Sequence, residues 1–169
     1  MTDLVTPRLS LRLMTVADAE QVVAGSPAPG VRWAPGYPSV GEVAAATRFL
    51  NTCAESGDPG PFGGYVIQRR EDAVVIGGVG FHGAPDEHRH VTIGYGLVPS
   101  ARGMGYASEA LRGLLRFARD RGVVCVHGDT DLDNVASQHV MTAAGMLFVK
   151  EDALLKHYRI EWDAPAPQG

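Results

Sequence analysis

One short stretch of the chain carries residue types that could hold a phosphate group. Residues 100–110 read SARGMGYASEA and place two glycines, Gly103 and Gly105, directly after Arg102. A helix-like run follows, so several backbone N–H groups would point at one spot beside the positive end of a helix dipole. Glycines let a phosphate approach the backbone closely. The glycines alone fit a plain tight turn equally well.

The spacing argues against two common phosphate-binding motifs. A P-loop needs Lys followed by Ser or Thr after its last glycine, and neither follows here. A dinucleotide fingerprint needs a small third residue where Ser108 stands, and an acid about twenty residues on, where Arg121 and Gly122 stand. What remains is the pattern Arg102-x-x-Gly105-x-Ala107 behind a strand that ends in YGLVP.

The elements that position this loop are strands that mostly follow one another along the chain, with helices inserted between some of them. Thr15 and Gly25 are typical of the two ends of a first helix, and residues 26–39 form a loop rich in Pro and Gly. The predicted helices are 15–25, 39–57, 106–122 and 134–145, and the predicted strands are 8–14, 65–72, 73–83, 91–99, 123–131, 146–150 and 154–162. This order predicts an α+β fold with a mixed sheet in a single domain, residues 1–162, followed by a flexible tail, 163–169.

The bulk composition bounds the class of protein. The chain has 169 residues and a net charge of −4, which argues against a general nucleic-acid binder and would suit an amine substrate. Cys53 and Cys125 are far apart and lack metal-ligand spacing, so we expect no disulfide, no metal and a cytoplasmic location. No signal peptide or membrane span is apparent, and we expect no membrane partner.

Two longer segments resemble a known family. The segment IGYGLVPSARGMGYASEALRGLLRFA, followed by DLDNVASQHVMTAAGM, resembles the GNAT superfamily of acyl-CoA-dependent N-acyltransferases. The opening TPRLSLRLMTVADAEQV is similar to that of its Rim-type branch, which includes ribosomal-protein N-terminal acetyltransferases. The resemblance covers roughly residues 5–162. It implies a mostly antiparallel twisted sheet flanked by helices, with splayed central strands, and acetyl-CoA as cosubstrate.

The resemblance also implies where the cosubstrate lies. Residues 102–107 would cradle the pyrophosphate of coenzyme A, and the strand around Leu97 and Val98 would pair with the pantetheine arm. A backbone N–H near Leu97–Val98 would stabilise the developing oxyanion. The implied cofactor-binding residues are Leu97, Val98, Arg102, Gly103, Met104, Gly105, Tyr106, Ala107, Ser108, Asn134 and Ser137.

Many members use a tyrosine on the last helix to protonate the leaving thiolate, and here Met141 stands at that position. Ser137 is the natural substitute, because it lies one helical turn after Asn134 and shares its face. Ser137 could instead be a small packing residue, and Asn134 a helix cap, a ligand of the cofactor arm, or both.

The general base is open at this level. Rim-type sequences often carry a strand glutamate where this chain has Thr92. His82 ends the preceding strand with a suitable ordinary pKa, and Glu87 lies in the turn with further titratable groups, Asp86, His88 and His90. Alternatively, His82 is a structural residue, the turn that contains Glu87 is simply solvated, and water rather than a single side chain deprotonates the amine.

The acceptor is also open. Trp33 and Tyr37 in the loop RWAPGYP would form an aromatic wall over it, unless Trp33 packs in the core. The expected function is acetyl transfer to a primary amine by direct attack, on a small molecule such as an antibiotic or metabolite, or on a protein or peptide N-terminus. The absent tyrosine and strand glutamate keep a non-catalytic acyl-CoA-binding sensor as an alternative. A homodimer would be in keeping with the superfamily.

Overall fold

The computed structural model describes residues 3–163 of the chain. Apart from Asp163, the predicted tail 163–169 lies outside the described residues, as do residues 1–2. The described part of the chain contains strands and helices in the order that the sequence predicts, with two additional strands of two residues each.

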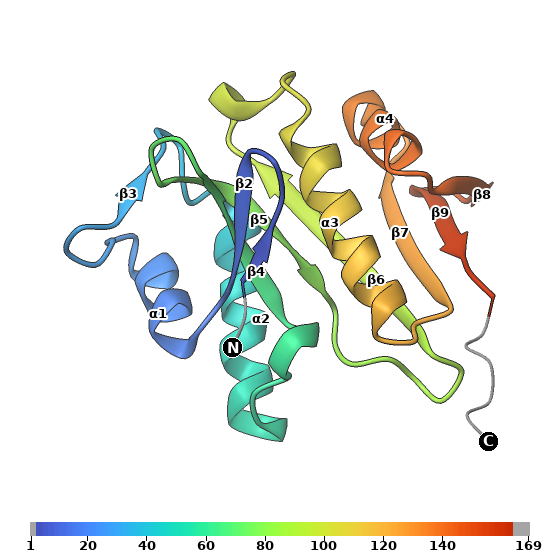
Figure 1. Cartoon of the computed structure of the whole chain (residues 1–169), viewed down its shortest axis with the longest axis horizontal. Coiled ribbons are helices and arrows are strands. Elements are labelled where there is room, and N and C mark those ends of the chain that lie inside the picture. Colours follow the sequence, from blue (N-terminus) through green and yellow to red (C-terminus); the bar gives the residue numbers. More distant parts are fainter. Residues whose placement is uncertain (1–2, 164–169) are drawn as a thin grey trace.

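A single nine-stranded sheet forms the centre of the described structure (Figure 1). Its strands are, in chain order, β1 (Leu4–Val5), β2 (Leu9–Leu13), β3 (Arg32–Trp33), β4 (Gly64–Arg69), β5 (Val74–Phe81), β6 (His90–Leu97), β7 (Cys125–Asp131), β8 (Leu147–Glu151) and β9 (Leu155–Glu161). They are ordered β1-β2-β4-β5-β6-β7-β9-β8, with β3 paired to β5. Only the β6–β7 and β3–β5 pairs are parallel, so the predicted α+β fold with a mostly antiparallel sheet is confirmed.

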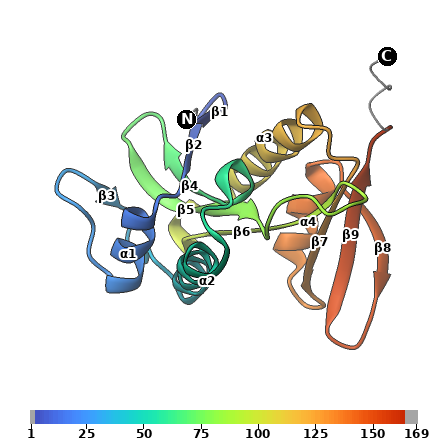
Figure 2. The ribbon, with the colours of Figure 1, turned by 90° about the horizontal axis from the view of Figure 1, so that it is seen from below.

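The helices cover both faces of this sheet. They are α1 (Val16–Ala24), α2 (Val40–Ser56), α3 (Tyr106–Asp120) and α4 (Val135–Ala143), with short 3-10 turns at Gly60–Phe62 and Pro99–Ala101. Helices α1 and α2 pack on one face, and α3 and α4 on the other (Figure 2). None of the helices in the described range is long and apolar enough to cross a membrane.

Local sequence signals explain where the helices begin and end. Thr15 and Asp18 form a reciprocal capping box at the start of α1, and Gly25 ends it in the left-handed conformation. Ser39 and Glu42 form the equivalent box of α2. Helix α3 has apolar residues at helical spacing, and it buries Ala110, Leu111, Leu114, Leu115 and Ala118.

The sheet opens between β6 and β7, which are parallel neighbours for only part of their length. Strands β6 and β7 pair at His90–Cys125, Val91–Val126 and Thr92–His127, and not beyond. Past Thr92, β6 keeps only β5 as a neighbour and β7 keeps only β9. The second half of β6 therefore has a backbone edge that no strand of the described chain covers.

Candidate active site

The glycine loop opens α3 without a side-chain cap. Gly103 and Gly105 have left-handed φ angles of 79° and 80°, and Gly105 is the N-cap of α3. No side chain of the described residues accepts a hydrogen bond from the first N–H groups of this helix, and a Cβ built on Gly103 meets open space. A helix start whose N–H groups have no side-chain acceptor is suited to an anion.

The other predicted loop residues surround this opening. Met104 is exposed, Tyr106 is buried, Ala107 is half-buried, and the Ser108 hydroxyl donates to the Gly105 carbonyl at 3.3 Å. The Arg102 side chain folds back, and its Nε donates to the Leu97 carbonyl at 3.1 Å. Arg102 therefore joins the loop to the end of β6 rather than pointing away from it.

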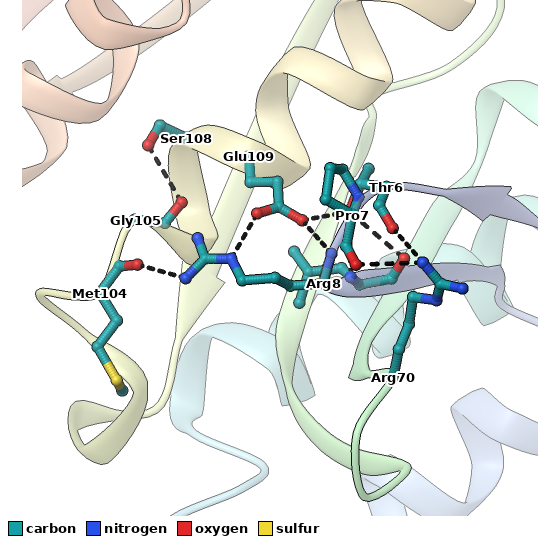
Figure 3. A network of polar contacts seen from close by, with 9 residues as sticks. Thr6, Pro7, Arg8, Arg70, Met104, Gly105, Ser108 and Glu109 are labelled. Carbon is teal, nitrogen blue, oxygen red and sulfur yellow. Dashed lines mark hydrogen bonds and ion pairs between the residues drawn. The ribbon is translucent and has the colours of Figure 1, made fainter.

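An arginine distant in sequence holds the loop in place (Figure 3). Arg8 Nη1 donates to the Met104 carbonyl at 2.8 Å, and Arg8 Nε donates to Glu109 Oε1 at 2.7 Å. The guanidinium lies 4.4 Å from the centre of the Tyr106 ring and adds positive charge beside Gly105. No local pattern marks Arg8 for this position, because only the folding of β2 beside α3 brings it there.

Glu109 anchors the same network. Its buried carboxylate accepts hydrogen bonds from the Thr6 hydroxyl and from the backbone and side chain of Arg8. Burial on its own would raise the pKa of Glu109, but these hydrogen bonds outweigh it and lower the pKa below its ordinary value. The Glu109 carboxylate is therefore ionised, and both of its oxygens accept hydrogen bonds that connect the loop to Thr6 and Arg8.

The two predicted backbone donors are the N–H groups of Leu97, at the end of β6, and of Val98, directly after it. Only one of them is free of a hydrogen bond to β5. The buried Val98 donates its N–H to the Ile76 carbonyl at 2.9 Å, so this group is already engaged with β5. Hydrogen bonding alternates along an antiparallel pair, so the Leu97 N–H, opposite Gly77 at the next position, points away from β5. Of the two, Leu97 is the one whose N–H faces the uncovered edge.

A hydroxyl pair bridges β6 and α4. Tyr95 on β6 places its hydroxyl 2.6 Å from Ser137 Oγ and 2.9 Å from the Ser137 carbonyl oxygen. Burial raises the pKa of Tyr95, so the phenol stays protonated at neutral pH. The pair lies beside the edge where β6 and β7 have separated, and Tyr95 was not among the predicted site residues.

The remaining α4 residues have structural roles. Asn134 caps the helix by accepting the Ser137 N–H at 3.1 Å. Met141, at the position of the usual tyrosine, is 1% exposed and packs over Gly128 of β7. Met141 is therefore a core residue. The hydroxyl groups available near this helix for proton transfer are those of Ser137 and Tyr95.

A cavity of about 680 Å³ lies on the α2 side of β5 and β6. The part of the lining that β5 and β6 supply includes glycines 77, 78, 80, 94 and 96. The side chains with polar groups that line it include Tyr37, Glu42, Arg48, His82 and Arg102. The cavity is thus a mainly apolar pocket with a few polar groups, as expected for a small-molecule site.

Glu42 carries an unpartnered oxygen in this cavity. It is 9% exposed, and its Oε2 accepts the Ser39 N–H at 3.0 Å. Its Oε1 is buried without a hydrogen-bond partner among the described residues and lies 3.6 Å from the Cβ position of Gly96. A buried carboxylate oxygen without a donor is costly unless a ligand supplies one. Glu42 was not among the predicted site residues, and its local sequence pattern is that of a capping box with Ser39, which carries no sign of this second role.

His82, one of the candidate bases named from the sequence, lines the cavity. Its ring packs against Gly94, where a Cβ would come within 2.9 Å of His82 Nε2. Burial lowers the pKa of His82, and the nearby positive charge of Arg48 lowers it further. The imidazole is therefore neutral at neutral pH and able to accept a proton.

Two predicted acceptor-site residues lie elsewhere. The Glu87 side chain is 86% exposed and pairs only with exposed His88, so the turn does not fold inward as one reading required. Trp33 belongs to the two-residue strand β3. Its ring contacts the Tyr37 ring edge to face, with ring centres 5.2 Å apart. Tyr37 lines the cavity and Trp33 does not, because pairing with β5 holds Trp33 at the sheet edge.

Comparison of the chain with known proteins identifies the family to which it belongs. The profile described as an acetyltransferase (GNAT) domain matches residues 8–147. The chain is 31% identical over 98 residues to the uncharacterized N-acetyltransferase YjdG of Bacillus subtilis (strain 168), covering 57% of this chain and 58% of that protein. It is 26% identical over 161 residues to the uncharacterized N-acetyltransferase YoaA of the same strain, covering 95% and 89%.

A solved structure of similar fold is RimL, a ribosomal L7/L12 alpha-N-protein acetyltransferase in complex with coenzyme A. It superposes with a TM-score of 0.70 at 18% identity, covering 97% of this chain and 100% of that one. The likeness to RimL shows the fold, and the profile match over most of the chain shows the family. The chain therefore belongs to the GNAT acetyltransferase family, whose members are acyltransferase enzymes.

Proposed function

We propose that this protein is an acetyl-CoA-dependent N-acetyltransferase that acetylates a primary amine by direct attack. The observation that carries the proposal is the position of β6. The glycine loop before α3 and the uncovered edge at Leu97 lie at its end, and the glycine-lined cavity with Glu42 lies on the α2 side of it.

The donor side fits acetyl-CoA. The uncapped start of α3, the open space at Gly103 and the charge of Arg8 suit a pyrophosphate. The Leu97 N–H would bind the thioester oxygen and stabilise it as it gains negative charge. When bound, acetyl-CoA supplies the acetyl thioester, whose carbonyl carbon forms a bond to the amine nitrogen while its bond to sulfur breaks.

The Tyr95–Ser137 pair would supply the proton that the departing sulfur needs. Each hydroxyl has one proton. If Ser137 gives its proton to sulfur, Tyr95 can donate its own to Ser137 Oγ across 2.6 Å. This relay replaces the helix tyrosine that Met141 displaces, and it favours catalysis over a role as an acyl-CoA sensor.

The acceptor side would handle the amine in two steps. The unpartnered oxygen of Glu42 would hold the ammonium form, which is the form that predominates at neutral pH. Neutral His82 would then accept the proton that the nitrogen must lose, directly or through one water. A cavity of about 680 Å³ suits a small amine, or the end of a peptide inserted into it.

The test combines calorimetric binding of acetyl-CoA with a free-thiol assay over aminoglycosides, nucleoside antibiotics, polyamines, amino acids and short peptides. We expect acetyl-CoA binding, and thiol release above hydrolysis with at least one amine class. Binding without thiol release from any of them would favour the sensor.

Glu42→Gln tests the amine site. Glutamine preserves the capping box but removes the charge, so the acceptor KM should rise about tenfold or more while acetyl-CoA affinity stays constant. The matched control is Asp18→Asn, which changes the equivalent capping box of α1 outside the cavity. An acceptor KM that changes equally in both variants would refute the role of Glu42.

A further inference from the structure

The β6–β7 junction carries a second cluster of reactive side chains, away from the loop and α4. His90 is the first residue of β6, and Cys125 and His127 are the first and third residues of β7. Residues two apart on a strand share a face, and His90 lies opposite Cys125 in the parallel register. The three side chains therefore converge on one side of the sheet.

Their donor atoms are spaced as the ligands of one ion. His127 Nε2 lies 3.2 Å from His90 Nδ1 and 3.4 Å from Cys125 Sγ, and all three atoms lie within 4.8 Å of one another. In a tetrahedral zinc site, bond lengths of about 2.0–2.1 Å to nitrogen and 2.3 Å to sulfur separate the ligand atoms by about 3.3–3.6 Å. Two of the three separations nearly match this spacing as they stand.

The chemistry of the set agrees with its geometry. Imidazole nitrogens and a thiolate are the ligands that Zn²⁺ prefers, and three protein ligands leave a fourth position for water. Cys125 is 2% exposed, while both histidines are half-buried, so the ion would have an approach from solvent.

We propose that His90, Cys125 and His127 form a zinc-binding site at the β6–β7 junction. Binding replaces the Cys125 thiol proton, which is released to solvent, and forms one bond from Zn²⁺ to each of the three donor atoms. The ion would join the two strands along the three positions at which they are paired. This departs from the sequence-based expectation of no metal, which rested on the wide spacing of the cysteines.

Cobalt provides a direct test because tetrahedral Co²⁺ bound to a thiolate absorbs visibly. We expect the full chain, stripped with chelator and titrated with Co²⁺, to bind one equivalent with a thiolate-to-cobalt charge-transfer band and tetrahedral d–d bands. Zn²⁺ should displace Co²⁺ and raise the melting temperature by several degrees.

The variants locate the ion. Cys125→Ser should abolish the charge-transfer band, and His90→Gln should weaken Co²⁺ binding tenfold or more. The matched controls are Cys53→Ser, on α2, and His88→Gln, two residues from His90 and exposed. Both controls should behave as the unmodified chain.

The proposal fails if the unmodified chain gives no charge-transfer band, if the band survives in Cys125→Ser, or if it is lost in Cys53→Ser. Weak uptake of several equivalents would likewise show surface binding rather than this site. Should Cys125→Ser not fold, the spectrum of the unmodified chain and the His90→Gln and His88→Gln pair still decide the question.

Discussion

The Tyr95–Ser137 contact makes a definite kinetic prediction at the scale of single residues. Ser137→Ala and Tyr95→Phe should each lower kcat, by about 10²-fold for Ser137→Ala, because the leaving thiolate loses its proton donor. Neither should change acetyl-CoA affinity by more than a few fold. Steady-state kinetics and calorimetry on each variant provide the measurement.

The control for this pair is Thr142→Ala, which removes an exposed hydroxyl from the same helix. Its kcat should stay at the level of the unmodified chain. Equal rates in Ser137→Ala and Thr142→Ala would show that Ser137 is only a packing residue. A rate loss in Ser137→Ala alone would leave Tyr95 outside the relay.

His82 makes a prediction about pH. A base must be deprotonated to act, and burial and Arg48 lower its pKa, so the acidic limb of the kcat/KM profile should fall below the ordinary histidine value of about 6.5. Removing the imidazole in His82→Asn should abolish this limb and reduce the plateau. A profile with the same limb in both proteins would assign deprotonation to water.

Sequence reasoning reached some of these residues and not others, for a physical reason. His82, Asn134 and Ser137 stand at ends of elements, where short-range patterns carry information. Arg8, Glu42 and Tyr95 take their roles from contacts with residues remote in the chain. Glu87 was assigned from its proximity in sequence, and the backbone of its turn directs it to solvent.

At the scale of elements, the loop before α3 can be tested against a matched turn. Gly103 and Gly30 have similar φ angles, 79° and 83°, and a Cβ on either meets open space. Alanine at either position should therefore cost a similar, small amount of stability, about 1 kcal/mol. Only Gly103→Ala should weaken acetyl-CoA binding, by about tenfold, because its methyl group would occupy space needed by the pyrophosphate.

Calorimetry with acetyl-CoA and denaturant unfolding of both variants make the comparison. Equal affinity in Gly103→Ala and Gly30→Ala would remove the loop as the pyrophosphate site. Loss of affinity in both would point to strain rather than to a contact with the ligand.

The elements themselves were largely predictable. The four predicted helix ranges are confirmed by the structure. At α1 the predicted cap Thr15 and stop Gly25 are also confirmed. Strand β3 was missed because two residues within a loop carry no period, and only its pairing with β5 makes it a strand. The end of pairing between β6 and β7 depends likewise on long-range contacts, so only the family resemblance indicated it.

At the scale of the whole molecule, Glu109 joins the N-terminal strands to α3. Glu109→Gln should lower the free energy of unfolding at pH 7 by about 1–3 kcal/mol, because Thr6 and Arg8 lose a charged acceptor. The folded pKa lies below the ordinary glutamate value, so this contribution is present above that value and is lost as the pH falls through the folded pKa.

Denaturant unfolding of both proteins between pH 7 and pH 3 measures this difference, which should shrink toward the acid end. Asp72→Asn is the control, because its ion pair with Arg69 spans only one turn and is partly exposed. A gap between Glu109→Gln and the unmodified chain that is constant with pH would contradict the assignment of the charge.

The placement of α2 and α3 on opposite faces of the sheet has a consequence for the order of events (Figure 2). In the proposed arrangement, the amine arrives from the α2 side and the nucleotide end of the donor lies at the start of α3. The two molecules need not pass each other, so neither must leave before the other enters. Such a layout favours a ternary complex over a ping-pong cycle, and initial-rate plots at several fixed donor concentrations should intersect rather than run parallel.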